Sequence, residues 1–454
     1  MKLPDPTDTI AAQATPPGAG AIAVLRLTGP AAFAKAALFL SPPVKSPAHR
    51  RAYVLAVKDA GRLIDKVVAV FFRGPASYTG QDTVEISCHG SPYIIRTILN
   101  LAVRNGARIA APGEFTLRAF LNGKLDLAQA EAVGELIASS SAGAHRAAIT
   151  QAEGELSARV AAVRGSLVEL LSEIEARLDD SYEEIPALRR RAFGRSAAAA
   201  HKKVLRLAAG FEAGKGIREG LNVVITGAPN SGKSSLLNAL LGYDRALVSR
   251  EAGTTRDLLE AALELDGFTV RFSDTAGLNA GRASRLELAG MARARKALAA
   301  AELVLLVKDA SIRASASDLR AEKEVAAAAG GAKVLRVFNK TDLPVRRSCA
   351  GGLPVSCRSG RGLGRLRTAL VARQKKTFSD GAQAVITSAR HFEALSGAAR
   401  ELAALGILLR AGNPQLELAA ERLRLALGEL ALISGETAPE EVLAGIFGKF
   451  CVGK

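Results

Sequence analysis

The chain has 454 residues, of which 4% are aromatic and none is Trp, and its formal net charge is +17. This length predicts two or three domains, and the excess of Lys and Arg fits a polyanionic partner, although a generally basic composition would give the same excess. Four cysteines without C-x-x-C spacing argue against a disulfide framework or a zinc site. With no signal-peptide pattern and no long apolar stretch, we expect a cytoplasmic protein that does not cross a membrane.

The character of the sequence changes near residue 123. Residues 1–123 are predicted to form an α+β domain, because short apolar runs, expected to be strands at 20–27, 66–72 and 83–87, alternate with loops that contain Pro and Gly. The following region is rich in Ala, Leu and Glu, and its apolar residues recur at helical spacing. They are Leu156, Val160, Val163, Leu167, Leu171, Ile174 and Leu178. We expect this stripe to be a helical core and residues 214–220 to be a linker.

A dense basic tract lies late in the helical region. It consists of Arg189–Arg191 together with Arg195. Such a tract is more often a solvated loop than a binding site, and both interpretations stay open at this point.

Gly227–Ser234 matches the full P-loop pattern G-x-x-x-x-G-K-[ST]. The glycines let backbone N–H groups surround phosphates, Lys233 brings positive charge to the β and γ oxygens, and Ser234 can ligate Mg²⁺. The context supports this interpretation, because the preceding residues 221–226 are predicted to be a buried strand and residues 235–241 a helix. The segment therefore predicts a nucleoside triphosphate site.

Three later segments narrow the nucleotide to a guanine nucleotide. Residues 270–277 predict a strand that ends in Asp-Thr-Ala-Gly, with Asp274 where a Walker-B carboxylate holds Mg²⁺. Residues 334–342 predict a strand that ends in Asn-Lys-x-Asp. The carboxylate of Asp342 would accept from the guanine ring N–H and amine, a pair of donors that adenine lacks. Residues 355–358 resemble the segment that supports the base. The alternative is a Gly-rich turn and two ordinary strand ends.

The sequence lacks the usual group that orients the attacking water. In Ras-like GTPases a Gln follows Asp-x-x-Gly, whereas this chain has Leu278 there. Asn230, inside the P-loop, could coordinate a monovalent cation, or it could only stabilise the loop by a hydrogen bond. Thr255 is a predicted switch-I ligand of Mg²⁺, and Thr254 is a neighbouring oxygen donor. This combination is similar to that of the potassium-dependent GTPases, in which a cation supplies the charge of an arginine finger.

Helical periodicity resumes from about residue 388 to residue 447, so the nucleotide domain is predicted to be inserted into a helical one. The expected fold is a combination of α/β and all-α domains. The predicted parts are an N-terminal α+β domain at 1–123, the first part of a split all-α domain at 124–215, an inserted Ras-like P-loop α/β GTPase domain at 216–380, and the second helical part at 381–454.

Motifs near both ends of the chain are specific to one family. They are Asp8–Gly18 (DTIAAQATPPG), Pro75–Gly80 (PASYTG), Cys88–Gly90 (CHG), Pro112–Asp126 (PGEFTLRAFLNGKLD) and Phe450–Lys454 (FCVGK). Together with the inserted G domain, these motifs resemble the MnmE/TrmE tRNA-modification GTPases over essentially the whole chain.

This resemblance implies a homodimer that works with an FAD-containing partner, MnmG (GidA), on tRNA. The pair would build an aminomethyl or carboxymethylaminomethyl group at C5 of the wobble uridine, U34. The one-carbon unit would come from a reduced folate, 5-formyl- or methylene-tetrahydrofolate, bound by the N-terminal domain. GTP would be hydrolysed with Mg²⁺ and K⁺ in the site.

The resemblance also assigns roles in the G domain. K⁺ would be held by Asn230, Ser249, Glu251 and Thr254, and Mg²⁺ by Ser234 and Thr255. Glu287 would position the attacking water, although it could equally be a surface helix-capping residue. The implied nucleotide contacts are Asn230, Ser231, Gly232, Lys233, Ser234, Ser235, Ser249, Thr254, Thr255, Asp274, Thr275, Ala276, Gly277, Asn339, Lys340, Asp342, Ser356, Cys357 and Arg358. Lys233 and Glu287 are the predicted catalytic residues for hydrolysis.

Outside the G domain, the resemblance implies folate contacts at Arg26, Glu85, Lys124 and Lys454. A carboxylate suits the donor edge of the pterin, and cations suit the glutamate tail. Without the family, Arg26 and Lys124 would be interpreted as ordinary solvated charges. Cys451 is implied to act in tRNA modification but not in GTP hydrolysis, while the sequence alone favours an inert thiol without a packing role.

Two other functions stay open from the sequence. A ribosome-assembly GTPase has similar G motifs, but such proteins usually carry a KH-type RNA-binding module after the G domain, and no G-x-x-G loop between strands is found there. A regulatory switch without chemistry would leave the C-terminal Cys and the folate-type residues unexplained.

Overall fold

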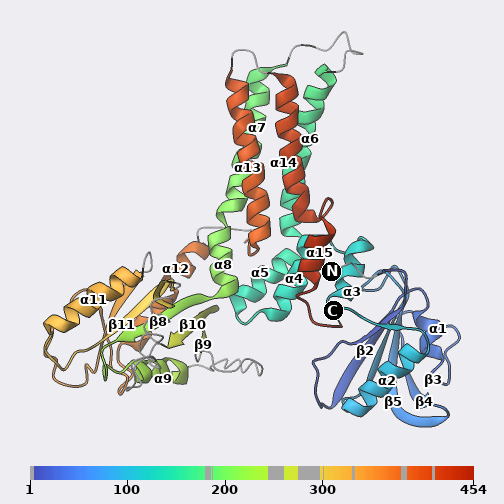
Figure 1. Ribbon diagram of the computed structural model, residues 1–454, viewed down its shortest axis with the longest axis horizontal. Coiled ribbons are helices and arrows are strands. Elements are labelled where there is room, and N and C mark those ends of the chain that lie inside the picture. The colour runs from blue at the N-terminus through green and yellow to red at the C-terminus, as the bar shows by residue number, and fades with distance from the viewer. Residues whose placement is uncertain are drawn as a thin grey trace, which may run out of the picture. The chain divides into compact units, whose positions relative to one another are not determined.

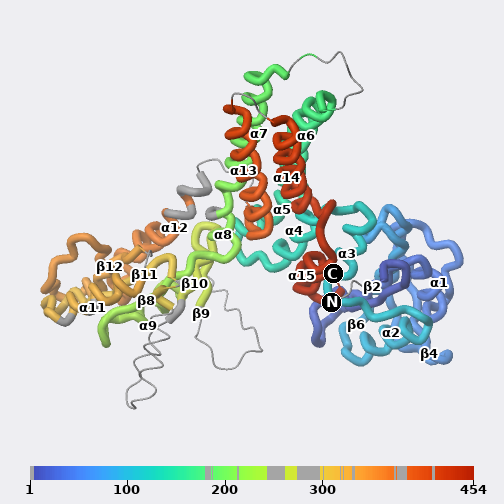
Figure 2. The backbone as a smooth tube through the Cα atoms, turned by 45° about the horizontal axis from the view of Figure 1, so that its top comes forward, coloured from blue at the N-terminus to red at the C-terminus, as the bar shows by residue number. Residues whose placement is uncertain are grey.

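The computed structural model describes residues 5–178, 186, 188–243, 260–274, 297–299, 301–329, 333–379, 386–411 and 415–453. The chain divides into two compact units, which Figures 1 and 2 show from two directions. The first unit consists of Met1–Gly134, Gln151–Lys202 and Ala394–Lys454, and the second of Glu135–Thr150 and Lys203–Glu393.

The N-terminal part of the first unit is a sheet with helices packed on it (Figure 1). Its strands lie in the order β3-β4-β5-β6-β2-β1-β7, and neighbours are antiparallel except for β1 and β7. The elements are β1 (Ile10–Gln13), β2 (Ile22–Thr28), α1 (Ala32–Ala37), β3 (Leu40–Ser41), β4 (Ala52–Asp59), β5 (Arg62–Phe72), β6 (Thr83–His89), α2 (Pro92–Arg104), β7 (Arg108–Ile109) and α3 (Glu114–Leu121). The strands expected near 20–27, 66–72 and 83–87 are β2, β5 and β6, so the predicted α+β fold is confirmed.

Alternation along the central strands places one side of each in the core. Leu25 and Leu27 on β2 and Val84 and Ile86 on β6 are fully buried, and so is Ile98 of α2. The other set of side chains on β2 and β6 includes charged groups, which therefore lie on the opposite side of the sheet from this core.

A buried charge network ties the N-terminal strand to α3. Glu114 and Arg118 are 1% exposed, and the Arg118 guanidinium donates to the Glu114 carboxylate at 2.8 Å. Arg108 donates to the same carboxylate at 2.6 Å, and the N–H of Ala111 donates at 2.7 Å. Arg118 also contacts the carboxylate of Asp8. Burial alone would raise the pKa of Glu114, but these hydrogen bonds outweigh it and hold the pKa below its usual value.

The helices of the first unit come from both sides of the G domain in the sequence. The helical elements are α4 (Leu127–Ala138), α5 (Ala142–Ala152), α6 (Glu155–Leu178), α7 (Arg190–Ala209), α13 (Ala389–Arg410), α14 (Leu416–Ser434) and α15 (Glu440–Phe447). Helices α4, α5, α7 and α13 each continue from one unit into the other. Helix α14 packs along α6, and both views show the two side by side (Figures 1 and 2). The two helical segments therefore share one packed region. Among the described helices, none is both long and apolar enough to span a bilayer.

The predicted apolar stripe of the first helical segment is largely correct. Its buried members on α6 are Leu156, Val160, Val163, Leu167 and Ile174. Leu171 and Leu178 are only half-buried, and Leu170, the neighbour of Leu171, is buried instead. The difference is one position on the helix, which is within the width of a helical apolar face.

The second unit contains a mostly parallel sheet in the order β13-β12-β11-β8-β10-β9, in which only β9 and β10 are antiparallel. Its further elements are α8 (Phe211–Glu219), β8 (Leu221–Gly227), α9 (Lys233–Tyr243), β9 (Glu260–Leu265), β10 (Phe268–Asp274), β11 (Leu303–Asp309), α11 (Ala316–Ala328), β12 (Lys333–Asn339), β13 (Leu353–Pro354) and α12 (Leu363–Ser379). The central strand β8 buries Leu221 and the consecutive apolar residues Val223, Val224 and Ile225, as expected for a parallel sheet with both faces covered. This is the α/β G-domain fold predicted from the sequence.

Two local predictions in this unit are wrong. Residues 214–220 form most of α8 and its C-terminal cap rather than a linker. Ile217 is 2% exposed and packs in the core of the G domain, which offsets the helix cost of the glycines. Helix α9 begins at Lys233 and continues to Tyr243, past Gly242, so it is longer than the predicted 235–241.

Candidate functional site

The nucleotide motifs lie at one edge of the parallel sheet of the second unit. Strand β8 ends at Gly227, the first residue of the P-loop, and β11 and β12 lie on one side of this strand. Val307 is opposite Gly227, and Asp309 is opposite Asn339. The carboxyl ends of parallel strands are where α/β sheets bind ligands, so the topology gathers the P-loop and the Asn-Lys-x-Asp segment at one place.

The backbone of the P-loop has a shape that requires its glycines. Gly227 has φ 149° and Gly232 has φ 92°. A Cβ at Gly227 would collide with the carbonyl oxygen of Val307, and one at Gly232 would collide with the side-chain nitrogen of Asn339. The loop leads directly into α9, whose first N–H groups have no helical partner. A curled loop before a helix N-terminus is a site that fits phosphate.

Lys233 is 8% exposed and folds back over this loop. Its ammonium donates to the carbonyl oxygens of Gly227 at 3.1 Å and Ala228 at 3.0 Å. The positive charge is therefore held beside the curled backbone, where phosphate oxygens would be attracted to it. Asn230 has φ 58°, the left-handed region that Asn tolerates best after Gly. The side-chain oxygen of Ser231 is buried without a hydrogen-bond partner among the described residues.

Asn339 joins the P-loop to the predicted base-binding segment. It is 2% exposed, its side-chain nitrogen donates to the carbonyl oxygen of Ser231 at 3.2 Å, and its side-chain oxygen accepts from the N–H of Cys357 at 3.3 Å. The buried hydroxyl of Ser356 donates to the exposed carboxylate of Asp342 at 2.7 Å and lowers its pKa below the usual value. An ionised, fixed carboxylate is the acceptor that the N–H edge of guanine needs.

Sequence reasoning missed Asp309, which fixes Lys340. The Lys340 ammonium donates to the Asp309 carboxylate at 2.6 Å, and Ser311 donates to the other oxygen of this carboxylate through its N–H and its hydroxyl. Burial alone would raise the pKa of Asp309, but the bonds from Lys340 and Ser311 outweigh it and lower the pKa. One signal in the sequence could have indicated Asp309. The apolar strand that precedes the Asn-Lys-x-Asp strand ends in this acidic residue.

Several predicted metal and switch residues lie outside the described residues. They are Ser249, Glu251, Thr254, Thr255, Thr275, Ala276, Gly277 and Glu287. Asp274 ends strand β10 beside Ile225 of β8, which brings its backbone to the same sheet edge as the P-loop. Among the described donors, Asn230 and Ser234 fit the predicted K⁺ and Mg²⁺, because amide and hydroxyl oxygens suit these hard cations. Ser235 lies in the first turn of α9, and Arg358 directly follows Cys357.

A second cluster lies on the N-terminal sheet of the first unit. Arg26 of β2 stands opposite Glu85 of β6, and its guanidinium donates to the Glu85 carboxylate at 2.7 and 2.9 Å. The guanidinium also lies 5.8 Å from the ring centre of Tyr78 and 5.6 Å from that of Phe115. Arg26 is therefore not an ordinary solvated charge, because a carboxylate and two aromatic rings fix its position. Tyr78 and Phe115 were not singled out from the sequence, although both fall within the quoted motifs.

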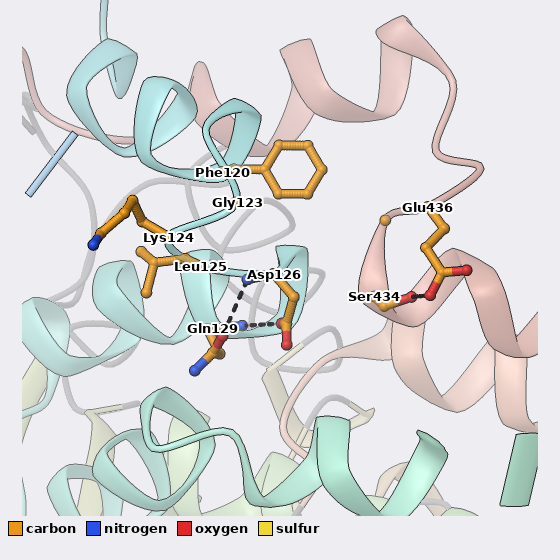
Figure 3. A pocket seen from close by; sticks show the side chains of 9 residues that line it. Phe120, Gly123, Lys124, Leu125, Asp126, Gln129, Ser434 and Glu436 are labelled. Carbon is orange, nitrogen blue, oxygen red and sulfur yellow. Dashed lines mark hydrogen bonds between the residues drawn. The ribbon is translucent and has the colours of Figure 1, made fainter. Parts of the chain in front are cut away.

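Lys124 lies next to the loop that carries Tyr78. A Cβ at Gly80 would be 3.4 Å from the Lys124 side chain, and the adjacent Asn122 donates to the carbonyl oxygen of Thr79 at 2.7 Å. Lys124 also lines a cavity of about 430 Å³ together with residues of the α14–α15 connection. Figure 3 shows its side chain directed away from Asp126 and Glu436. Lys124 is thus a cation beside the loop that contributes Tyr78 to the Arg26 cluster.

The C-terminal tail docks on this region. The N–H of Gly113 donates to the carbonyl oxygen of Cys451 at 3.3 Å, and Val452 forms an antiparallel bridge with Pro112. Gly453 has φ 101°, and a Cβ there would collide with the carbonyl oxygen of Gln13. The backbone around Cys451 therefore has a packing role that the sequence did not suggest.

The docked tail contacts β1, the strand that pairs with the strand carrying Arg26. Gln13 follows Ala12, which is the β1 partner of Arg26. The side chain of Cys451 is exposed, and all four cysteines are free thiols. Lys454 lies outside the described residues.

Comparisons with known proteins cover essentially the whole chain. The family model "GTP-binding protein TrmE N-terminus" matches residues 9–124, and "MnmE helical domain" matches residues 127–451. The chain is 41% identical to the tRNA modification GTPase MnmE of Azoarcus sp. (strain BH72), over 100% of this chain and 99% of that protein. The chain belongs to the MnmE/TrmE family of tRNA modification GTPases.

Other members of the family match as completely. The MnmE proteins of Thiobacillus denitrificans and Cytophaga hutchinsonii are 40% and 38% identical and match 100% and 99% of this chain, over 99% and 98% of their own lengths. Among solved structures, the G domain of the T. maritima FeoB iron transporter is 26% identical over 34% of this chain and 97% of its own, with a TM-score of 0.25. The predicted family membership is confirmed by the full-length relatives. The roles of individual MnmE-type site residues stay predictions.

Proposed function

We propose that this chain hydrolyses GTP and couples the hydrolysis to modification of C5 of the wobble uridine, U34, in tRNA. The observation that supports it most is the fixed carboxylate of Asp342 at the sheet edge of the P-loop, in a chain that matches MnmE proteins from end to end. GTP is favoured over ATP, because adenine would leave this carboxylate without its two donors. We further propose the four-part division at 123, 215 and 380 and a cytoplasmic location.

In the G domain, we propose that Lys233 binds the β and γ phosphates and that Ser234, with Thr255, holds Mg²⁺. K⁺ would be held by Asn230 together with Ser249, Glu251 and Thr254. The cation supplies positive charge that stabilises the transferred phosphoryl group. In arginine-finger systems, such a charge raises the rate of hydrolysis by a factor of about 10³–10⁵. Glu287 would position the attacking water.

The potassium proposal has a direct test. Hydrolysis of GTP by the purified chain is measured in K⁺ and in Na⁺ at the same ionic strength. We expect GTP hydrolysis to be at least about tenfold slower in Na⁺ than in K⁺. This difference is smaller than the full arginine-finger effect, because the cation needs to supply only part of that effect. Equal rates in the two salts would remove K⁺ from the mechanism.

In the N-terminal part, we propose that Arg26, Glu85, Lys124 and Lys454 bind a reduced folate, 5-formyl- or methylene-tetrahydrofolate. The folate supplies the one-carbon unit. A carboxylate can accept from the pterin N–H groups, and cations attract the glutamate tail, so the charges and aromatic rings of the Arg26 cluster fit this ligand. Cys451 would act in the modification step, beside the docked tail. A homodimer and an FAD-containing MnmG (GidA) partner complete the proposed complex.

The whole proposal is tested by deleting the gene and analysing tRNA nucleosides by mass spectrometry. We expect the aminomethyl or carboxymethylaminomethyl group at C5 of the wobble uridine to disappear and to return when the wild-type gene is restored. An unchanged nucleoside profile would contradict the proposed function, while a change confined to ribosomal particles would favour a ribosome-assembly GTPase.

A further inference from the structure

Helix α7 has two opposite faces with different chemistry. Phe193, Ala197 and Ala200 lie at i, i+4 and i+7 and are at most 3% exposed. Arg191, Arg195 and Lys202 lie at i, i+4 and i+11 and are exposed. At 3.6 residues per turn these three cations fall within about 40° of one another, roughly opposite the buried stripe. The helix contains no Asp or Glu over its whole length.

The arginines of the neighbouring helices differ from Arg191 and Arg195 of α7. On α6, Arg159, Arg164 and Arg177 each lie within ion-pair distance of a carboxylate. On α14, Arg422 and Arg424 lie 2.8 Å from Glu401 and Glu175. By contrast, none of the carboxylates that the structure describes forms an ion pair with Arg191, Arg195 or Lys202. The charge on this face of α7 is therefore available to an external anion.

We propose that the face formed by Arg191, Arg195 and Lys202 binds the phosphate backbone of the tRNA. This inference rests on the proposed function, because it takes tRNA as the substrate. The basic tract that the sequence left open between a solvated loop and a binding site is thus assigned, in its helical part, to nucleic-acid contact.

The dimensions and the spacing suit a backbone rather than a single phosphate. Arg191 and Lys202 are 11 positions apart, about 16 Å along the helix axis. The residues between them on the same face include Ala198, which is exposed and small. A straight row of long cations without bulky neighbours can follow several phosphates of one strand, and each contact gains affinity by releasing counterions. Arg is also suited to bidentate phosphate contacts.

The test compares two triple variants of the full-length chain that each remove three positive charges. The first is R191A/R195A/K202A. The matched control is K58A/R62A/K66A, which removes three exposed cations from the N-terminal sheet. Binding of unmodified tRNA is measured over a range of salt concentrations. Helix content and intrinsic GTP hydrolysis, to which neither set contributes in our account, verify that both variants are folded.

We expect the α7 variant to bind tRNA on the order of tenfold to a hundredfold more weakly at 0.1 M salt, and the slope of log K against log salt to fall by about 2 to 3. The control should stay within about twofold of the wild type. Equal losses in the two variants would show a non-specific charge effect and overturn the proposal. Unchanged tRNA binding with loss of the FAD-containing partner would assign this face to a protein contact and overturn it as well. If wild-type protein binds no tRNA, the proposed function itself fails.

Discussion

The nucleotide site and the N-terminal site are assembled in different ways. At the nucleotide site, Lys233, Asn339 and Asp342 belong to short motifs at the ends of β8 and β12, two parallel strands that have β11 between them. At the N-terminal site, Arg26, Glu85 and the tail around Cys451 come from opposite ends of the chain. The first site depends on the shape of one loop and the second on the docking of distant segments.

This difference predicts which changes damage each site. A change of backbone shape in the P-loop should abolish nucleotide binding and leave the N-terminal site unaffected. A change that loosens the docked tail should impair tRNA modification while GTP hydrolysis continues. The two sites can therefore be separated by single substitutions.

The largest effect is expected for Gly227→Ala. Its Cβ would collide with the carbonyl oxygen of Val307, a backbone atom of the central sheet that cannot move aside. We expect GTP affinity to fall on the order of a thousandfold, about 4 kcal/mol, because the P-loop cannot keep its curl. Titration with a fluorescent GTP analogue measures the loss. Gly242→Ala is the control, since a Cβ there meets nothing within 4 Å, and a similar loss in this control would contradict the explanation.

Glu114→Gln tests the buried charge network that Glu114 forms with Arg108 and Arg118. It removes the charge that partners the buried Arg118, and breaking a buried pair costs about 3 kcal/mol or more. Because the pKa of Glu114 is lowered in the folded state, its contribution is present above its unfolded pKa, about 4.3, and is lost as pH falls through the folded value. Unfolding of the wild type should therefore become easier below about pH 4.

The pH dependence separates this explanation from simple damage. In Glu114→Gln, thermal unfolding followed by circular dichroism should show a lower midpoint at pH 7 and a smaller further drop between about pH 5 and pH 3. Glu417→Gln, at an exposed position of α14, serves as the control and should leave the wild-type profile unchanged. A variant profile with the full acid drop would show that Glu114 does not carry the effect.

Asp342→Asn should change which base is bound. The amide replaces an acceptor by a donor, so guanine loses two charge-assisted hydrogen bonds and GTP affinity should fall by about a hundredfold. Xanthine has a carbonyl group where guanine has the amine, and the variant should bind xanthosine triphosphate better than the wild type does. Competition binding with the two nucleotides measures both changes. Equal affinity of the variant and the wild type for GTP would remove Asp342 from base recognition.

The smallest effect is expected for Gly453→Ala. Its Cβ would collide with the carbonyl oxygen of Gln13, and its φ of 101° is strained for Ala, at a cost of about 1–2 kcal/mol. The tail should undock part of the time, and formation of modified uridine should slow by about tenfold, while GTP hydrolysis stays within about twofold. Gly445→Ala in α15 is the control, because a Cβ there has open space. Equal slowing of both reactions would contradict the separation of the two sites.

The arrangement of the nucleotide motifs at one sheet edge could be predicted from the sequence, because its information is local. The P-loop glycines, the strand ends and the order of the motifs all lie within short segments, and the parallel topology follows from the alternation of strands and helices. The contact between Asp309 and Lys340 could not be predicted, because it requires the register of β11 against β12. Helix α8 was missed for a similar reason, since only the tertiary burial of Ile217 outweighs its glycines.

The N-terminal site could be anticipated only through the family. Nothing local in the sequence pairs Arg26 with Glu85, since their contact depends on the antiparallel register of β2 and β6. Tyr78 and Phe115 join them from a loop and from α3, and the docked tail comes from beyond α15. Long-range packing of this kind leaves no periodic signal in the sequence.

The most direct test of the central claim is reconstitution of the modification reaction. The purified chain, its FAD-containing partner, a reduced folate and tRNA from the deletion strain are combined in K⁺ buffer, and the wobble nucleoside is measured by mass spectrometry. The proposal predicts a C5-modified uridine with GTP and a much lower yield with a non-hydrolysable GTP analogue. The same yield with the analogue, or without any nucleotide, would contradict it.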